Sequence, residues 1–310
     1  MVTSSSDGSV TIFDIREKKP VLDWKLERAD EEALCLSLGY EGNLVAVGSS
    51  RGKIHFLDVR SGRMLGTYEN GHTNEVTQCC FQQTLSSSDG TSITTPTLIS
   101  TCEDGLICLY DTTKPSEELA LENIINVQSP VREAGFFGPR SDGIYCLTGD
   151  ESLKLYNASS SICRKDSGHQ LRNLLSQQMQ THLGTACPME YLVDCSWDSS
   201  TNQLLLLAGS ATGNAGVFQV GENDIAPVYH LGGGHQGVIR AWSRQSSSIF
   251  LTAGEDARLC EWSSQKIAPT SSTLKSKTII SKGSNNRRTT TERRGKVRRP
   301  RSKMTHTPYG

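Results

Sequence analysis

A hairpin-like pattern that recurs six times along the chain sets the strongest limit on its fold. Each copy has a short apolar run, a turn with Gly or a small polar residue, and an alternating segment that ends in an aromatic residue or Leu. Period-2 alternation on both sides of turn-forming residues is typical of a β-hairpin. The copies occupy residues 2–14, 45–58, 98–111, 145–157, 205–219 and 250–263. The chain is therefore expected to consist of repeated antiparallel β units.

The spacing between equivalent positions gives the length of the repeating unit. Measured at Asp14, Asp58, Asp111, Asn157, Gln219 and Ser263, the spacings are 44, 53, 46, 62 and 44 residues. Polar insertions account for the two long intervals, at 82–96 and at 164–188, the second with a short helix expected around 171–179. Further alternating segments precede the later hairpins, at 32–38, 75–81, 131–137, 191–197 and 237–243, and weaker outer strands are expected near 63–68 and 227–231. Four strands at a period near 44 residues describe a propeller blade.

Short markers in these units make the chain similar to the WD40-repeat β-propeller family. The markers are a Gly-His pair before the inner strand and an aromatic-Asp pair that closes the third strand. They correspond here to Gly71-His72, Gly234-His235, Phe13-Asp14, Leu57-Asp58, Tyr110-Asp111 and Trp262. The resemblance covers about residues 2–262. It implies an all-β fold whose loops bind other proteins.

The resemblance also implies a buried relay of His, Asp, Ser or Thr, and Trp inside a blade. The last hairpin has the full set, His235, Asp256, Thr252 and Trp262, and the third has His72, Asp104 and Ser100 with Tyr110 at the Trp position. The first hairpin keeps only Thr3 and Asp7, the second has Arg51 and Leu57 at the Asp and Trp positions, and the fifth lacks the set.

The same residues allow a second interpretation, as a hydrolytic triad of His, Asp and Thr. That interpretation is the weaker one, because groups committed to one another inside a blade are not presented in a cleft. The sequence also lacks a G-x-S-x-G motif, an H-E-x-x-H motif, a P-loop and a Cys/His metal spacing. The relay is therefore expected to be structural, and the protein is not expected to be an enzyme.

The number of hairpins bears on the closure of the ring. Propellers of this family commonly have seven blades, whereas six hairpins occur here and the first begins mid-blade. The expected fold is an all-β WD40 β-propeller over residues 1–265, a seven-bladed ring lacking its N-terminal one and a half blades. Unpaired strand edges favour association. The chain expressed alone is therefore expected to aggregate or to need an added N-terminal extension.

The C-terminal part, residues 266–310, is expected to be a disordered basic tail. Residues 263–310 contain 13 Lys and Arg against one acid, whereas residues 1–262 carry a net charge of −13. A segment with few apolar residues and dense charge cannot bury a core. Its densest cluster consists of Arg293, Arg294, Lys296, Arg298, Arg299, Arg301 and Lys303. Such a cluster suits nuclear import, and a solvated tail or an electrostatic RNA contact are the alternatives.

The cysteines are expected to be packing residues. Most of the ten lie singly in apolar runs and no C-x-x-C pair occurs, in a chain with no secretory signal and no run of 18 apolar residues. No cofactor, metal, membrane or small-molecule substrate is expected.

The sequence predicts a non-catalytic scaffold for protein–protein interactions, nuclear or nucleocytoplasmic and not secreted. A nuclear or nucleolar RNA-associated or ribosome-assembly factor that uses the basic tail is the alternative. Charged residues near the starts of the inner strands are candidate partner contacts: 30–32, Glu75, Arg132 and Arg240. Solvated loop charges are equally common at such positions.

Overall fold

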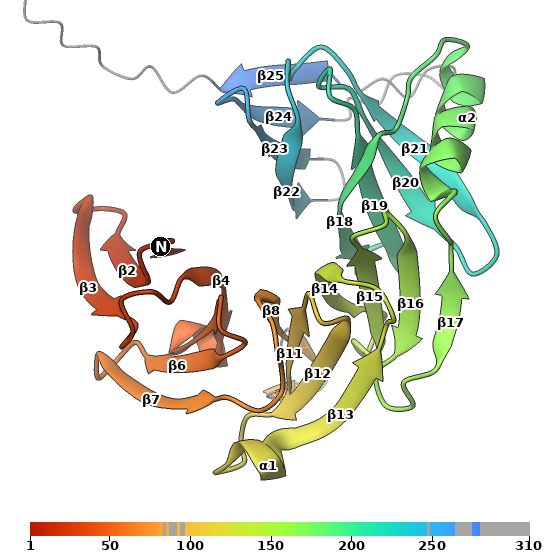
Figure 1. The fold of residues 1–310 in the computed structure, drawn as a ribbon. Helices are drawn as coiled ribbons and strands as arrows, with labels where there is room; N and C mark the ends of the chain where they lie inside the picture. Colours follow the sequence, from red (N-terminus) through yellow and green to blue (C-terminus); the bar gives the residue numbers. More distant parts are fainter. Residues whose placement is uncertain (83–84, 87–91, 94–96, 247–248, 264–274, 280–310) are drawn as a thin grey trace, which may run out of the picture. The chain divides into compact units, whose positions relative to one another are not determined.

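Six consecutive antiparallel sheets of three or four strands form the main body of the described part of the chain, beside one two-stranded sheet in an insertion (Figure 1). The computed structural model describes residues 1–82, 85–86, 92–93, 97–246, 249–263 and 275–279. Each of these six sheets is one blade, with four strands in blades 2 to 6 and three in blade 1. The chain is thus an all-β, six-bladed propeller with few helices, as the repeat predicts. A seventh blade stays a prediction.

The strands follow one another along the chain within each blade. Blade 1 has β1 (Val2–Ser4), β2 (Ser9–Asp14) and β3 (Lys19–Lys25), and blade 2 has β4 (Ala33–Gly39), β5 (Leu44–Ser49), β6 (Ile54–Asp58) and β7 (Arg63–Tyr68). Blade 3 has β8 (Val76–Phe81), β11 (Thr97–Cys102), β12 (Leu106–Asp111) and β13 (Leu121–Asn126). Blade 4 has β14 (Val131–Phe137), β15 (Gly143–Thr148), β16 (Leu153–Asn157) and β17 (Cys163–Asp166). Blade 5 has β18 (Tyr191–Asp198), β19 (Gln203–Gly209), β20 (Ala215–Val220) and β21 (Ile225–Leu231), and blade 6 has β22 (Ile239–Ser246), β23 (Ile249–Gly254), β24 (Leu259–Ser263) and β25 (Lys275–Ile279).

Smaller elements decorate these blades. They are the 3-10 helix η1 (Tyr40–Gly42), the short helix α1 (Glu117–Ala120), the two-residue strands β9 (Leu85–Ser86) and β10 (Ser92–Ile93), and helix α2 (Leu171–Leu183). Helix α2 is longer than the helix expected around 171–179. It buries Leu171, Leu175 and Met179 against blade 5 and ends at Gly184, whose φ of +70° is a left-handed cap. No helix among the described residues combines the length and hydropathy needed to cross a membrane.

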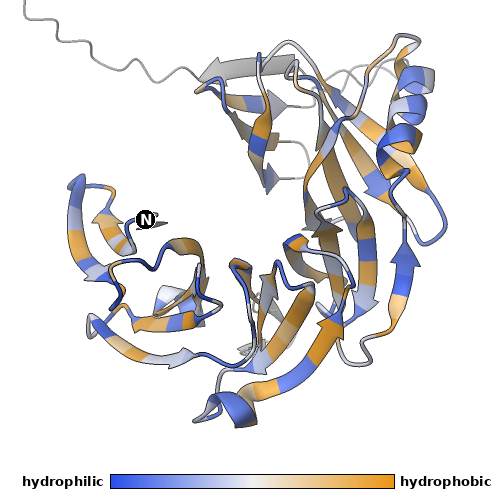
Figure 2. Cartoon of the chain, viewed as in Figure 1, coloured by the Kyte–Doolittle hydropathy of each residue, from blue (hydrophilic) through white to orange (hydrophobic). Residues whose placement is uncertain are grey.

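The hydrophobic core lies between the blades. Five apolar clusters occur among the described residues, and each combines residues of two successive blades. Strand β19 illustrates the reason, since Leu204 and Leu206 pack toward blade 4 while Leu205 and Leu207 pack toward blade 6. Side chains alternate between the faces of a strand, so a strand covered on both faces reads as a continuous apolar run. Figure 2 shows such runs along the middle strands, with hydrophilic residues in the turns.

The predicted elements agree closely with the observed ones. All six hairpins are present, and the expected segments at 131–137 and 63–68 coincide with β14 and β7. The boundary at residue 265 is different in the structure. Strand β25 pairs with β24 inside the range assigned to the tail, and the compact unit extends to Ile279. The segment Lys275–Ile279 is polar and short, and therefore carries no apolar alternation that would identify it as a strand.

Candidate functional site

Blade 6 holds the four predicted relay residues in one hydrogen-bonded chain. His235 Nδ1 lies 3.0 Å from Asp256 Oδ1, and His235 Nε2 lies 2.8 Å from Thr252 Oγ1. The indole N–H of Trp262 donates to Thr252 Oγ1 at 2.7 Å. The network assigns the protons: imidazole N–H donates to the carboxylate, and the Thr hydroxyl donates to the other ring nitrogen. Every polar side-chain group of these four residues is thereby paired.

The same geometry speaks against the hydrolytic-triad interpretation. Thr252 is only 1% exposed, and its hydroxyl already bonds both His235 and Trp262. A nucleophile must reach a substrate, which this buried hydroxyl cannot do. The relay therefore acts as a clamp that fixes the turn between β23 and β24 to the segment before β22.

The glycine of each Gly-His pair has a steric role. A Cβ at Gly234 would lie 2.6 Å from the Trp262 ring, and a Cβ at Gly71 would lie 1.9 Å from the Tyr110 hydroxyl. Any side chain would push the aromatic ring out of the blade. The marker pair is thus a small residue beside the ring, followed by the histidine that bonds the turn.

Blade 3 has the same arrangement in a looser form. His72 Nε2 lies 2.6 Å from Ser100 Oγ, but His72 Nδ1 lies 3.5 Å from Asp104 Oδ2. The Asp104 carboxylate accepts the backbone N–H groups of Thr73 and Leu106 at 3.0 and 2.9 Å. Tyr110 occupies the Trp position, and its buried hydroxyl makes no hydrogen bond within the described residues. This blade keeps the residue types and loses the close His–Asp bond.

One position explains how the blades differ. Each of the six predicted hairpins has one turn, and one residue directly precedes it. In every blade the backbone carbonyl of that residue accepts a hydrogen bond from the backbone N–H three residues later. We call this residue the turn-opening residue; in blades 1 to 6 it is Ser5, Ser49, Cys102, Thr148, Ser210 and Gly254. A Cβ at Gly254 would lie 2.8 Å from His235 Nδ1 and 2.9 Å from Asp256 Oδ1. The close His–Asp bond is therefore found where this residue is Gly, and Cys102 stands at the same place in blade 3.

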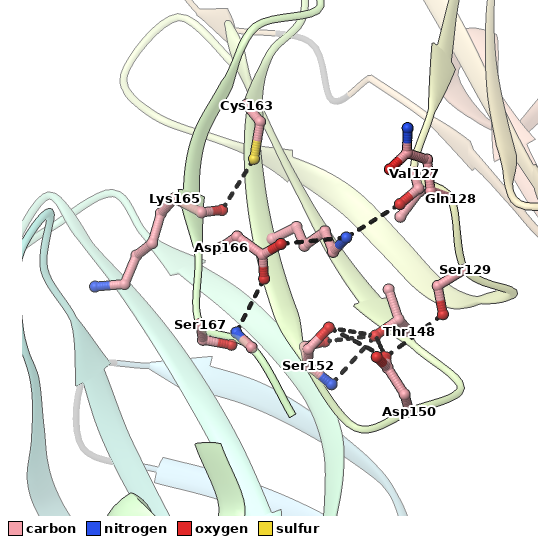
Figure 3. Close-up of polar contacts among 12 residues, drawn as sticks. Val127, Gln128, Ser129, Thr148, Asp150, Ser152, Cys163, Lys165, Asp166 and Ser167 are labelled. Atoms are coloured by element: carbon pink, nitrogen blue, oxygen red, sulfur yellow. Dashed lines mark hydrogen bonds and ion pairs between the residues drawn. The ribbon is translucent and has the colours of Figure 1, made fainter. Parts of the chain in front are cut away.

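Blade 4 has no relay histidine and uses its turn-opening hydroxyl instead. Thr148 Oγ1 bonds the Asp150 carboxylate and lies 2.6 Å from Ser152 Oγ (Figure 3). The carboxylate also accepts from Ser152 at 3.2 Å. In blade 5, Ser210 and Thr212 pair in the same place at 2.9 Å. Local hydroxyl contacts thus close the turn where the histidine is missing.

Blade 2 contains a buried network around Glu31, so the expectation that this residue of the 30–32 segment contacts a partner is wrong. Glu31 is 2% exposed, and its Oε1 lies 2.6 Å from Ser49 Oγ and 2.9 Å from His55 Nε2. Thr67 lies 3.1 Å from the other nitrogen of His55. Burial raises the pKa of Glu31, but the hydrogen bonds from Ser49 and His55 outweigh it and hold that pKa below its ordinary value. One signal in the sequence pointed to this network: His55 lies on the third strand of a blade that has no Gly-His pair.

A cavity lies where the inner strands of blades 4, 5 and 6 begin. Its volume is about 310 Å³, and we call it the blade 4–6 cavity. Its lining consists of Arg132, Glu133, Glu151, Tyr191, Leu192, Val193, Val238, Ile239 and Arg240. Two of the predicted interface residues, Arg132 and Arg240, are therefore brought together. Asp30, which precedes the inner strand of blade 2, does not line this cavity and forms an ion pair with Arg51.

Ion pairs and hydrogen bonds fix the wall of this cavity. Arg132 Nη1 donates to Glu151 at 3.0 Å, and Arg132 Nη2 donates to the Leu192 carbonyl at 2.5 Å. The second oxygen of Glu151 accepts the Leu192 N–H at 2.6 Å. The Tyr191 hydroxyl accepts the Ile239 N–H at 2.7 Å. Blades 4, 5 and 6 are thus tied together at this end by polar contacts.

Two partly buried carboxyl groups lie at the same end. Burial and the nearby Asp194 charge raise the pKa of Glu133 to about 7, although Arg132 opposes them. Burial likewise raises the pKa of Asp194 to about 6, against hydrogen bonds from the Tyr145 hydroxyl at 2.9 Å and the Cys195 N–H at 2.6 Å. In this low-dielectric environment the Asp194 charge disfavours ionisation of Glu133. Near neutral pH this pair therefore changes its charge.

The basic cluster of the tail cannot be placed. Its seven residues, between 293 and 303, lie outside the described residues. The cysteines can be placed: Cys108, Cys146, Cys195 and Cys260 are buried, as the apolar runs predict, and Cys35 is half-buried.

Comparison with known proteins identifies similar WD-repeat chains. A family model described as WD domain, G-beta repeat matches residues 62–111, which include His72, Ser100, Asp104 and Tyr110. The chain is 25% identical over 264 residues to WD repeat-containing protein 89 homolog of Dictyostelium discoideum, covering 84% of this chain and 67% of that protein. It is 27% identical over 277 residues to WD repeat-containing protein GTS1 of Arabidopsis thaliana, covering 85% and 66%. The chain thus spans about two thirds of the length of both relatives.

Solved structures support the same fold. A chain of the structure titled Crystal Structure of Mitotic Checkpoint Complex matches with a TM-score of 0.62 at 17% identity, covering 85% of this chain and 72% of that one. The computationally designed Ika8 protein matches with a TM-score of 0.56 at 18% identity, covering 84% and 67%. At such identities the likeness extends to the propeller fold alone. The repeat match and the two relatives confirm the resemblance of this chain to the WD40-repeat family and, within it, to WD repeat-containing protein 89.

Proposed function

We propose that the protein is a non-catalytic scaffold that binds a segment of a partner protein at the blade 4–6 cavity. WD40 propellers generally bind other proteins, which supports the class of function. The observation that carries the location is the cavity itself, about 310 Å³ in volume and lined by three blades. Its wall is held by contacts among Arg132, Glu151 and Leu192 before any partner arrives. Such preorganisation lowers the entropy that binding costs.

The chemistry of the rim indicates a polar partner segment with at least one acidic group. The Arg240 side chain is 66% exposed, and its guanidinium donates through Nε and Nη2 to a single oxygen of Glu255. An exposed pair of this kind contributes little to stability and can exchange partners. A carboxylate of another protein could replace Glu255 and bind the guanidinium in a bidentate manner. Arg and Tyr, both present here, are enriched at the energetic centres of interfaces.

Charge reversal at Arg240 tests the location of the interface. The substitution Arg240→Glu is expected to weaken binding of the partner about tenfold, because it places two like charges at the rim. The measurement is affinity purification with quantitative mass spectrometry on the full chain, followed by titration of the purified partner. Arg164→Glu is the matched control. Arg164 lies on the outer strand β17 and also forms an exposed ion pair, with Glu222 at 3.5 Å. Equal loss of binding in both variants, or in neither, would contradict this location.

We also propose that the complex is nuclear and that the basic tail directs it there. The support is the sequence of residues 293–303, with seven Lys and Arg. The alternative function, an RNA-associated or ribosome-assembly role, rests on the same charge. Basic side chains neutralise phosphates and release counterions, so RNA association through the tail would fall steeply as salt rises.

Deletion of residues 284–310 separates these roles. Loss of nuclear accumulation with unchanged partner binding is the result expected of an import signal. Loss of salt-sensitive RNA crosslinking in a variant that is returned to the nucleus by an unrelated import signal would instead favour the RNA role. Unchanged localisation and unchanged RNA association would remove the support for both.

A further inference from the structure

We propose that blade 3 binds one Zn²⁺ ion through His72, Cys102 and Asp104. The three residues come from different places: His72 precedes β8, Cys102 ends β11, and Asp104 lies in the turn between β11 and β12. One ligand atom of each, a ring nitrogen of His72, Cys102 Sγ and an Asp104 oxygen, lies within 4.8 Å of the other two. Imidazole, thiolate and carboxylate are the ligands that Zn²⁺ uses in proteins. This proposal is independent of the partner surface.

The orientation of His72 is that of a metal ligand. The His72 side chain is 0% exposed, and its Nδ1 faces Asp104 Oδ2 at 3.5 Å, too far apart for a well-formed hydrogen bond. The other ring nitrogen, Nε2, lies 2.6 Å from Ser100 Oγ. The Ser100 hydroxyl can accept a hydrogen bond from the Nε2–H, which is the reverse of the direction in blade 6, and in that tautomer Nδ1 is free for a metal. In that tautomer the lone pair of Nδ1 and the Asp104 carboxylate both face the site, and a cation between them relieves their repulsion.

The other two ligands are also held in place. Asp104 accepts backbone N–H groups from Thr73 and Leu106, at 3.0 and 2.9 Å. The backbone N–H of Asp104 lies 3.3 Å from Cys102 Sγ, which orients the sulfur toward the turn. The Asp104 side chain is 10% exposed, so one side of the site reaches the surface. Three protein ligands leave one of the four Zn²⁺ positions open for water.

Blade 6 provides an internal comparison. Its turn-opening residue is Gly254 in place of Cys102, and its His235 Nδ1 bonds Asp256 at 3.0 Å. With Gly at that position the His and Asp form a closed pair, and a third ligand is missing. With Cys at that position the pair stands at 3.5 Å, and a sulfur atom lies beside it. The two blades therefore differ at this position by one residue: Gly254 accompanies a hydrogen-bond relay in blade 6, and Cys102 completes a set of three metal ligands in blade 3.

The choice of metal follows from the ligand set. Mg²⁺ and Ca²⁺ require oxygen ligands, whereas a thiolate and an imidazole favour Zn²⁺. Burial raises the pKa of the Cys102 thiol to about 12 in the absence of an ion. Coordination replaces the thiol proton, which leaves to solvent, and the Zn–S bond forms without any change of oxidation state. The sequence expectation that Cys102 is only a packing residue is the competing interpretation.

The test is metal binding by the full chain after removal of metals with a chelator. Zn²⁺ is titrated in competition with a chromophoric chelator, and Co²⁺ is used as a spectroscopic probe of thiolate coordination. The expected result is one Zn²⁺ per chain and a sulfur-to-cobalt charge-transfer band. Cys102→Gly, which copies blade 6, is expected to abolish the band and weaken Zn²⁺ binding at least 100-fold while the protein stays folded. Asp104→Asn is expected to weaken binding by about 10- to 100-fold.

Cys146→Ser is the matched control. Cys146 is also buried, and it belongs to no cluster of possible metal ligands among the described residues. This variant should keep both the stoichiometry and the cobalt band. Retention of the band in Cys102→Gly would overturn the proposal, as would the absence of stoichiometric Zn²⁺ binding by the unsubstituted chain. Circular dichroism of each variant distinguishes loss of a ligand from loss of the fold.

Discussion

Replacing Trp262 by Ala is expected to lower the free energy of unfolding by about 3–5 kcal/mol. The ring is fully buried in the apolar cluster between blades 5 and 6, against Phe250 and Leu207 among others. Its removal would leave a cavity in a closely packed interior and would also orphan the hydroxyl of Thr252, to which the indole donates at 2.7 Å. Equilibrium unfolding in urea, monitored by circular dichroism, measures the change.

Two further variants divide this effect into its parts. Trp262→Phe keeps much of the apolar ring and removes the N–H donor, so a loss of roughly 1–3 kcal/mol is expected. Leu259 lies on the same strand, β24, but is 42% exposed. Leu259→Ala should therefore change the free energy of unfolding by less than about 1 kcal/mol. A Trp262→Ala loss no larger than that of Leu259→Ala would show that the ring does not pack as described.

Stability is expected to fall by roughly 1–3 kcal/mol as pH rises from about 4.5 to about 7, through the Glu133 and Asp194 pair. The folded-state pKa of Glu133 is raised to about 7 and that of Asp194 to about 6. Across this window the folded protein keeps protons that the unfolded chain has already lost. The unfolded state is therefore favoured progressively until both carboxyl groups are ionised in both states.

Other groups act in different directions and are separated by substitution. Burial lowers the pKa of His72 and of His230, so these two groups stabilise the fold as pH rises toward 6.5. The charges that face Glu133 are Arg132 and Asp194, and both stay in place in Glu133→Gln. This variant should flatten the pH dependence measured by urea unfolding at pH 5 and pH 8. Glu255→Gln, at the exposed rim, should leave the dependence unchanged. A Glu133→Gln variant with the original dependence would contradict the assignment.

The features that the sequence could predict are local ones. Turn residues between alternating segments identify each hairpin, because the side-chain period of a strand is two and does not depend on what packs against it. The outer strands were harder to identify. Strand β3 is mostly exposed and β17 is a polar four-residue strand, so neither carries the apolar alternation that marks the inner strands. The position of β25 was missed for the same reason.

The relay residues were predicted from the resemblance to the WD40-repeat family, which implies a place for each of them in a blade, whereas the other sites arise from contacts between segments. Glu31 reaches His55 across 24 residues, and Arg132 reaches Leu192 across 60, so no spacing rule connects them. Cys102 was visible only as one cysteine in an apolar run, and its place beside His72 depends on how the turn of one strand pair folds against the segment before β8. The sequence by itself determined the blades and their order, since these follow from short-range periodicity. The tertiary structure alone decided which charged side chains and which proposed metal ligands meet, because their distances depend on how the strands, turns and successive sheets pack.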